Sequence, residues 1–165
     1  MKNSATINNV SHPFEPIYNQ ESEILILGSF PSVKSREEHF YYGNIHNRFW
    51  KVLAAVFSCS VPTNVEQKKE FLLSHHIALW DILKSCDISR SADSSIKNTR
   101  PNDIFKVISH SRVNKIVLNG KTALKYFEKY FKPDTTIQVI CLPSTSPANA
   151  AWSLEKLIDA WSVIL

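Results

Sequence analysis

Hydrophobic residues in this chain gather in short runs that alternate with longer amphipathic stretches. Two of the runs, residues 23–28 and 137–142, are apolar and β-branched without an alternating polar face, and each ends in a small, polar loop that contains proline. A run of this kind is typical of a strand covered on both sides, as in a parallel sheet. Ligands bind beyond the carboxyl ends of such strands, so the two loops predict two walls of one cleft.

Strands and helices are predicted to alternate over the rest of the chain. Short apolar runs predict two more strands, at residues 77–83 and 115–118. Apolar residues at helical spacing predict helices over 48–57, over 66–75, from 104 after a Pro-Asn-Asp start, over 122–131, and over 153–164 with Ser153 as the cap. This order indicates βαβ units, and therefore an α/β fold whose parallel sheet is covered by helices on both faces.

The remaining segments are polar. Residues 1–22 are interrupted by prolines, and we expect them to form an extended lead-in. Residues 29–46 and 84–100 are expected to be loops. One folded domain is therefore predicted over residues 23–165, without linkers or internal repeats.

Composition narrows the class of protein. The chain has 165 residues, of which 44% are hydrophobic, enough for one domain with a substantial core. Its net charge of +4 permits an anionic partner without establishing one. Cys59, Cys86 and Cys141 are widely spaced and odd in number, so neither a disulfide framework nor a zinc site is expected. No apolar stretch approaches the ~20 residues of a membrane span, and we expect a cytoplasmic protein.

Several familiar chemistries lack their motifs. Gly28 is the only glycine of the first loop, which excludes a dinucleotide fingerprint and a phosphate-binding P-loop. No serine lies in a Gly-x-Ser-x-Gly elbow, and no cluster of histidine and cysteine offers metal ligands. The sequence therefore predicts a reaction without metal or cofactor, or simple binding.

Aromatic residues, amides and an arginine are concentrated in residues 40–50. Aromatic faces stack on planar bases, amides read hydrogen-bonding edges, and basic groups meet phosphate. Phe49 and Trp50 have helical spacing, which favours core anchors. Tyr42 lies outside that spacing beside Gly43, and is either a stacking face or another anchor.

Six segments, taken in order, resemble the uracil-DNA glycosylase superfamily, and within it the DNA-deoxyinosine (hypoxanthine-DNA) glycosylase branch. They are residues 27–32, 41–50, 78–83, 93–96, 118–121 and 142–147. The resemblance spans residues 23–165. It implies a three-layer α/β/α fold around a four-stranded parallel sheet. It also implies a monofunctional enzyme of base excision repair, a hydrolase of N-glycosyl bonds (EC 3.2.2 class).

Such an enzyme flips a deaminated base out of duplex DNA and hydrolyses its N-glycosidic bond, without a cofactor. Hypoxanthine is the base that the resemblance favours, with uracil as a further substrate. By the same resemblance, Tyr42 stacks on the base, and the backbone of Ser29 and Phe30 lines the pocket floor. Asp81 contacts the base edge, or alternatively caps its loop.

The resemblance also assigns contacts to DNA. The loop that relatives press into the minor groove as a wedge is formed here by Ser144, Thr145, Ser146 and Pro147. Asn149 and Lys121 either contact the DNA backbone or belong to a solvated surface. The implied partner is double-stranded DNA with a deaminated base, bound by a monomer associated with the nucleoid, without metal or membrane.

The catalytic asparagine is displaced relative to part of the family. Phe30 stands where mismatch-specific relatives carry a water-positioning asparagine. Asn47 and Asn44 are the candidates for that role later in the loop, and Asn47 is alternatively a helix cap. Ser32 replaces a glycine of many relatives, and a serine also fits a turn.

Three other functions stay open at this point. One is a glycosylase directed at uracil or mismatches. Another is a catalytically silent module that binds lesions in DNA, because Phe30 replaces the asparagine. The last is a small α/β protein that binds nucleotides. A bifunctional lyase is not expected, because no lysine of the recognised pocket motifs is placed to form a Schiff base.

Overall fold

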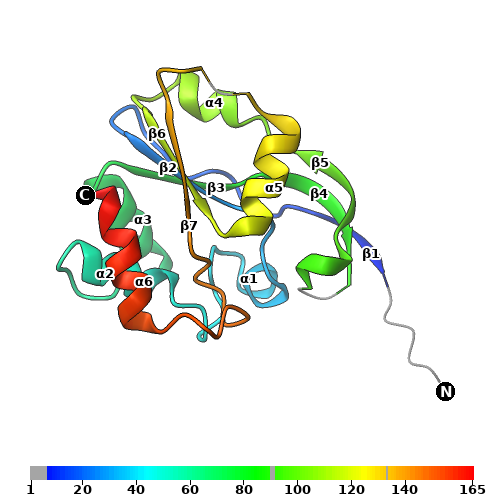
Figure 1. The fold of residues 1–165 in the computed structure, drawn as a ribbon, viewed down its shortest axis with the longest axis horizontal. Coiled ribbons are helices and arrows are strands. Elements are labelled where there is room, and N and C mark those ends of the chain that lie inside the picture. Colours follow the sequence, from blue (N-terminus) through cyan, green and yellow to red (C-terminus); the bar gives the residue numbers. More distant parts are fainter. Residues whose placement is uncertain (1–6, 90–91, 133) are drawn as a thin grey trace.

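The computed structural model describes residues 7–89, 92–132 and 134–165. Residues 1–6 of the predicted lead-in and residues 90–91 of the predicted loop 84–100 lie outside the described residues. The centre of the fold is a four-stranded parallel sheet in the order β3-β2-β6-β7 (Figure 1). Its strands are β2 (Ile24–Gly28), β3 (Ile77–Asp81), β6 (Lys115–Asn119) and β7 (Gln138–Leu142). The four predicted strands are confirmed, although the strand predicted over residues 77–83 ends at Asp81.

The core lies along the middle of this sheet. Leu25, Ile26 and Leu27 of β2 are fully buried, and so are the three central residues of β6. β7 was expected to be covered on both sides, and this expectation is wrong: apart from Leu142 its residues are exposed or half-buried. β7 is the edge strand, so its apolar run alone does not reveal how far it is covered.

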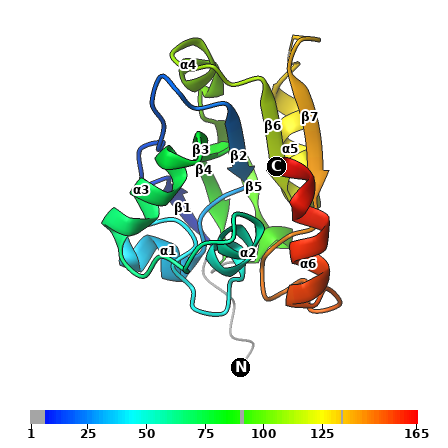
Figure 2. The same ribbon diagram turned by 90° about the vertical axis from the view of Figure 1, so that its left-hand side faces the viewer.

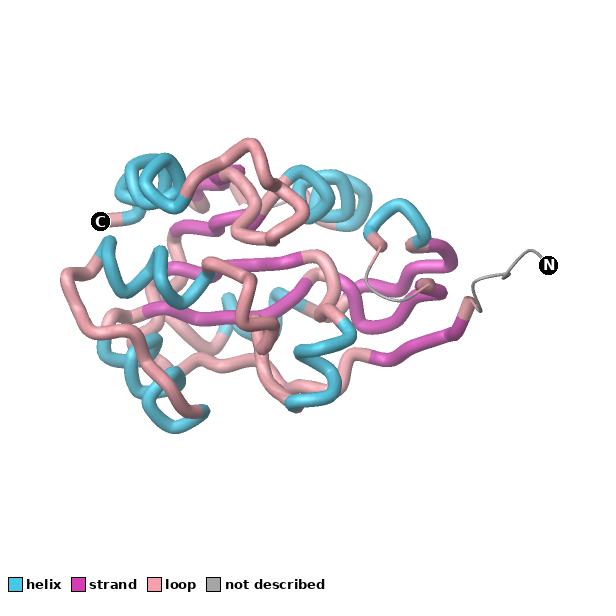
Figure 3. Tube along the Cα trace, turned by 90° about the horizontal axis from the view of Figure 1, so that it is seen from below, coloured by secondary structure: helices cyan, strands magenta, loops and turns pink. Residues whose placement is uncertain are grey.

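Helices cover the sheet on both sides (Figure 3), which confirms the predicted three-layer α/β/α fold. α2 (Phe49–Val56) packs against α6 (Leu154–Trp161), α3 (Val65–Ser74) against β3, and α5 (Lys121–Tyr130) against β6. α4 (Ile104–Ser109) precedes β6. The predicted cap is also confirmed, since Ser153 Oγ accepts the N–H of Lys156 at 3.2 Å. Within the described ranges, no helix has the length and apolar character needed to cross a bilayer.

A short helix, α1 (Val33–Glu38), replaces part of the loop expected over residues 29–46. Ser32 is its cap rather than a turn residue, because its Oγ accepts the N–H of Ser35 at 3.2 Å. Ser35 is the only buried residue in the helix. An apolar stripe, the signal that identified the longer helices, is therefore missing here.

A second sheet was not expected from the sequence. β1 (Asn8–Ser11), β4 (Leu83–Ile88) and β5 (Lys97–Pro101) form an antiparallel sheet in the order β1-β4-β5. The predicted polar loop over residues 84–100 is thus wrong. Polar side chains join the strands: Asp87 accepts hydrogen bonds from Asn9 at 2.9 Å and from Asn98 at 2.6 Å.

The segment before β2 is integrated into the fold. Besides β1, Ile17 exchanges backbone hydrogen bonds of 2.9 and 2.8 Å with Leu79. Tyr41 donates its hydroxyl to the carbonyl of Glu15 at 2.8 Å. The first residues described are therefore extended, as expected, but paired with the domain rather than leading into it. Figure 1 shows β1 at the outer edge of the second sheet, beside β4.

Candidate active site

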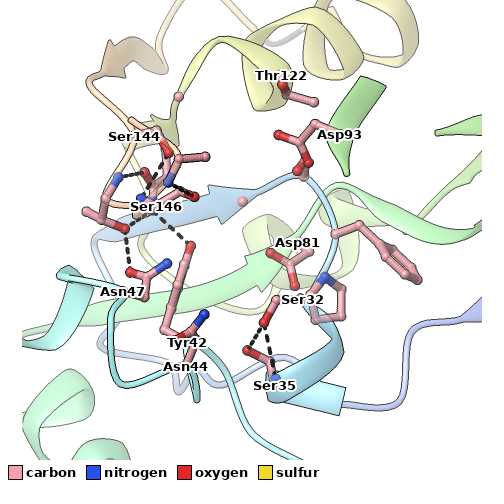
Figure 4. A pocket seen from close by; sticks show the side chains of 18 of the residues that line it. Ser32, Ser35, Tyr42, Asn44, Asn47, Asp81, Asp93, Thr122, Ser144 and Ser146 are labelled. Atoms are coloured by element: carbon pink, nitrogen blue, oxygen red, sulfur yellow. Dashed lines mark hydrogen bonds between the residues drawn. The ribbon is translucent and has the colours of Figure 1, made fainter. Parts of the chain in front are cut away.

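A cavity of about 520 Å³ opens at the carboxyl edge of the parallel sheet (Figure 4). The loops after β2 and β7 line it together, as predicted from their sequences. The strand register explains this, because Gly28 pairs with Asp81 and Asn119 pairs with Leu142, so the strands end side by side. The cavity brings together most of the expected site residues: Ser29, Phe30, Tyr42, Asn44, Asn47, Asp81, Lys121, Ser144, Thr145, Ser146 and Pro147.

Asp81 is a buried carboxylate at the end of β3, with 6% of its side chain exposed. Its Oδ2 lies 2.7 Å from Nε2 of His12, whose side chain is 2% exposed. Asn102 donates its amide to the backbone carbonyl of Asp81 at 2.9 Å. A buried carboxylate requires such partners, because the cost of leaving it unpaired is several kcal/mol. His12 therefore holds one carboxylate oxygen and leaves Oδ1 to the cavity side, next to Gly28.

Gly28 permits this close approach. A Cβ at position 28 would lie 2.4 Å from Oδ1 of Asp81 and 3.0 Å from the hydroxyl oxygen of Tyr42. Both distances are shorter than ordinary van der Waals contacts. The glycine identified in the first loop thus allows the carboxylate and the phenol to converge on the backbone at the end of β2.

Tyr42 is fixed at the cavity wall by its ring and by its hydroxyl. One ring face stacks on Phe49, with the centroids 3.9 Å apart and the planes at 16°. Asn119 donates its amide to the Tyr42 hydroxyl at 3.1 Å. Burial raises the pKa of the Tyr42 phenol far above its ordinary value, the Asp81 charge adds to this, and the Asn119 hydrogen bond opposes it. The phenol is therefore a neutral group that donates and accepts hydrogen bonds.

Three polar side chains form a network beneath Tyr42. Asn119 donates to Oγ1 of Thr145 at 3.1 Å and accepts the Thr145 N–H at 3.1 Å. Thr145 in turn donates its hydroxyl to Oδ1 of Asn47 at 2.9 Å. Thr145 is fully buried. These hydrogen bonds join the ends of β6 and β7 to the start of α2.

The two candidate asparagines differ in what their carbonyl oxygens contact. Oδ1 of Asn47 accepts two hydrogen bonds, from the Thr145 hydroxyl and from the N–H of Phe49 at 3.0 Å. Asn47 lies one residue before Arg48, the N-cap of α2, so it is not the helix cap that the sequence raised as an alternative, although its Oδ1 satisfies the N–H of the first helical residue. Oδ1 of Asn44 accepts the N–H of His46 at 2.9 Å. Among the described residues this is its single donor, so one lone pair faces solvent.

The loop that follows β7 is clamped by Arg48. Its guanidinium donates to the carbonyls of Ser146 at 2.9 Å, Asn149 at 3.1 Å and Trp152. The arginine that the sequence placed at the mouth of the cleft thus binds backbone carbonyls. Asn149 lies outside the cavity lining, and its amide donates to the Ser144 carbonyl at 3.0 Å. It orders the loop from within.

The wall opposite Tyr42 carries Asp93 and Thr122 (Figure 4), and Lys121 precedes Thr122 in the cavity lining. Asp93 belongs to a short 3₁₀ helix, Asp93–Ser95, between β4 and β5. Although the residue is exposed as a whole, partial desolvation of its carboxyl raises its pKa, and a hydrogen bond with Thr122 opposes the shift. The site therefore has carboxylates on two sides.

Comparison with known proteins identifies the family. The model of the uracil DNA glycosylase superfamily matches residues 15–164. The chain belongs to this superfamily. The match begins before β2, in agreement with the pairing of Ile17 to the central sheet.

Within the uracil DNA glycosylase superfamily, the chain is similar to two archaeal proteins named hypoxanthine DNA glycosylase. The protein from Methanosarcina barkeri is 34% identical over 116 residues, which cover 68% of this chain and 73% of the relative. The protein from Methanosarcina acetivorans is 32% identical over 151 residues, or 89% and 93% of the two chains. An NMR structure of a candidate uracil DNA glycosylase from Methanosarcina acetivorans superposes with a TM-score of 0.75 at 28% identity, covering 92% and 96%.

Four residues of this glycosylase-family site were not identified from the sequence: His12, Asn119, Asp93 and Thr122. His12 lies in the polar lead-in, where no pattern points to the cavity. Asn119 and Asp93 lie within segments that carried the resemblance, so their polar side chains after a strand or in a loop were an available signal.

Lysines were also misplaced. Lys121 was expected here as a contact to DNA, and no lysine was expected to be placed for a Schiff base, yet both Lys34 and Lys121 line the cavity. Lys34 lies 3.5 Å from Glu38, one helical turn along α1. Their presence makes the absence of lyase chemistry a question for experiment.

Proposed function

We propose that this superfamily member is a monofunctional DNA glycosylase that flips hypoxanthine out of duplex DNA and hydrolyses its N-glycosidic bond. The observation that carries the proposal is the buried Asp81 carboxylate, held by His12 at the cavity wall with Oδ1 beside Gly28. The two relatives named hypoxanthine DNA glycosylase support the same choice of base.

The carboxylate suits a deaminated purine because of one hydrogen-bonding position. Hypoxanthine carries an N1–H donor where adenine carries an N1 lone pair. An ionised Asp81 accepts the N1–H and repels the lone pair, since a carboxylate is an acceptor only. Uracil also presents an N–H beside a carbonyl, so the same contact accounts for uracil as a further substrate.

The remaining groups fit the hydrolysis. The transition state is an oxocarbenium-like sugar with a departing anionic base, so placing a water and stabilising charge are the tasks of the site. We assign the water to Asn44, whose Oδ1 retains an open lone pair, in preference to Asn47. The water oxygen attacks C1′, the C1′–N9 bond breaks, and its electron pair leaves with the purine. The proton that the water releases neutralises the departing purine anion.

We assign the base-binding roles to Tyr42 and to the backbone of Ser29 and Phe30. The Tyr42 phenol is neutral, and its oxygen accepts a hydrogen bond from Asn119. Its own O–H group is the donor that we assign to a hydrogen bond with the base. Lys121 and the loop of residues 144–147 line the cavity, and we assign the contacts with the DNA backbone to them. All of the residues to which we assign these roles belong to one chain. We therefore propose a monomer that acts on DNA in the cytoplasm, at the nucleoid.

A single-turnover assay tests this function. Protein in excess is mixed with end-labelled duplexes that carry one inosine, uracil, xanthine or adenine, and alkali then cuts abasic sites. We expect cleavage at inosine, slower cleavage at uracil and none at adenine. Cleavage at uracil alone would identify a uracil enzyme. Binding to the inosine duplex without any abasic product would identify a silent lesion-binding protein.

Borohydride trapping separates the two glycosylase mechanisms. A monofunctional enzyme uses water, so no covalent complex with DNA is expected. A trapped complex that disappears in Lys121→Gln or Lys34→Gln would instead show a Schiff base and a bifunctional lyase.

A further inference from the structure

The turn of residues 44–47 carries an apolar side chain with no packing partner. Ile45 is 78% exposed, the largest exposed fraction among the large hydrophobic side chains of the described residues. The next values belong to the terminal Leu165, at 73%, and to Ile7 and Val163, at 56% each. Burial of an isoleucine is worth about 1.5–3 kcal/mol, so this one contributes almost nothing to the stability of the free protein.

The turn is rigid. Asn47 donates its N–H to the Asn44 carbonyl at 2.9 Å, and Asn44 Oδ1 accepts the His46 N–H at 2.9 Å. The end of the turn is fixed by the contacts of Asn47 with Phe49 and Thr145. Ile45 is β-branched, which restricts its own side-chain rotamers. The exposed group is therefore held in place before any ligand binds.

The turn lies at the rim of the cavity. Asn44 and Asn47, which flank its tip, both line the cavity. Figures 1 and 2 show this cyan turn at the lower edge of the molecule, beyond the carboxyl ends of β2 and β6 and beside the orange loop after β7. The two segments are joined by the hydrogen bond from the Arg48 N–H to the Thr145 carbonyl, 3.1 Å. DNA that delivers a base to this cavity must therefore approach the turn.

The loop after β7, expected to act as the wedge, offers small side chains. Its exposed residues at the rim are Pro147 and Ala148, and Ser146 uses its Oγ to accept the Ala148 N–H at 3.2 Å. Proteins that distort DNA frequently insert an apolar side chain between base steps, and the cost of unstacking is a few kcal/mol per step. A large apolar group suited to that task is present across the rim, at Ile45.

We propose that Ile45 is the wedge that enters the DNA stack and fills the space vacated by the flipped base. This inference rests on the proposed glycosylase function and adds the group that promotes flipping. Ser146 and Pro147 then contact the DNA on the other side of the space that the flipped base leaves.

Ile45→Ala tests the wedge, because the truncated side chain is exposed and the fold does not depend on it. The rate of base release is measured under single turnover on inosine in a duplex and in a single strand, where no stacked pair must be opened. We expect a loss of about tenfold or more on the duplex and less than about twofold on the single strand. Ile45→Leu keeps an apolar group of equal size and should restore the duplex rate.

Val163→Ala is the matched control, since Val163 is 56% exposed and lies at the carboxyl end of the chain. Its rates should equal the wild-type rates on both substrates. A wild-type duplex rate in Ile45→Ala, or equal losses on both substrates, would overturn the wedge assignment while leaving the glycosylase in place. A wild-type protein that releases no base from either substrate overturns the proposed function instead. If the wild type acts on duplexes alone, inosine opposite an abasic analogue replaces the single strand.

Discussion

At the scale of single residues, the proposed function depends on a carboxylate that is buried in the fold and hydrogen-bonded by a residue from a distant segment. Asp81 and His12 are 69 residues apart in the sequence and 2.7 Å apart in the fold. His12→Ala would leave the Asp81 carboxylate buried without this donor. We expect a loss of about 2–4 kcal/mol in the free energy of unfolding, the range for hydrogen bonds to charged groups and broken buried pairs.

Urea denaturation of His12→Ala and His12→Gln checks this expectation. Glutamine retains an N–H donor near the position of Nε2, so it should recover a large part of the lost stability. An unchanged midpoint in the alanine variant would show that the pair contributes little.

The two candidate asparagines are separable by what each substitution damages. Asn44→Ala removes the oxygen with an open lone pair, so inosine release should slow by about two orders of magnitude or more, with little change in Tm. Asn47→Ala removes the acceptor of the Phe49 N–H at the start of α2 and of the Thr145 hydroxyl, so its Tm should fall, with about 1–2 kcal/mol lost. Single-turnover rates and thermal melts on both variants make the comparison. A slow enzyme with normal stability in Asn47→Ala would reverse the assignment.

At the scale of elements, the polar sheet β1-β4-β5 is held by a carboxylate that accepts from both neighbours. Hydrogen bonds from Asn98 and Asn9 lower the pKa of Asp87 below its ordinary value. A carboxyl whose pKa is lower in the folded state stabilises the fold above its unfolded pKa, and this contribution is lost as the pH falls through the folded value. Tm measured from pH 6 to pH 2.5 should therefore decline more steeply in the wild type than in Asp87→Asn. If the curves of Tm against pH run parallel for the two proteins, Asp87 does not stabilise the fold.

This sheet also shows where sequence patterns stop. The buried strands and long helices follow from apolar runs and helical spacing, which report burial directly. β4 and β5 are joined by Asn and Asp side chains, and α1 is capped by Ser32 without an apolar stripe. Polar contacts of this kind depend on which strands become neighbours, and local composition does not encode that. The same limit explains why His12, the partner of Asp81, was missed although most of the predicted site residues line the cavity.

The clamp on the loop after β7 makes a further prediction at this scale. Arg48→Met removes a guanidinium that contacts carbonyls of three residues, Ser146, Asn149 and Trp152. We expect faster amide exchange over residues 143–152 and slower base release, because the cavity wall loses its fixed position. Lys51→Met, an exposed charge on the same helix, is the control and should match the wild type. Equal exchange in both variants would show that Trp161, which donates to the Pro143 carbonyl at 3.0 Å, is sufficient to hold the loop.

At the scale of the whole molecule, two features act together in the proposed function. The modest positive charge attracts the DNA polyanion, and the cavity at the carboxyl edge of the sheet accepts the rare damaged base. With a net charge of +4, binding to DNA should weaken with salt, by a slope of about 0.9 per phosphate neutralised in a plot of log affinity against log salt. Lys121 is exposed at the cavity rim and is the cation best placed to neutralise one DNA phosphate. Lys121→Gln should therefore reduce the slope by about one, and Lys156→Gln on the exposed side of α6 should leave it unchanged. Fluorescence anisotropy with an inosine duplex from 50 to 300 mM salt measures all three proteins. Identical slopes for Lys121→Gln and the wild type would move the DNA backbone away from this wall, toward the turn that carries Ile45.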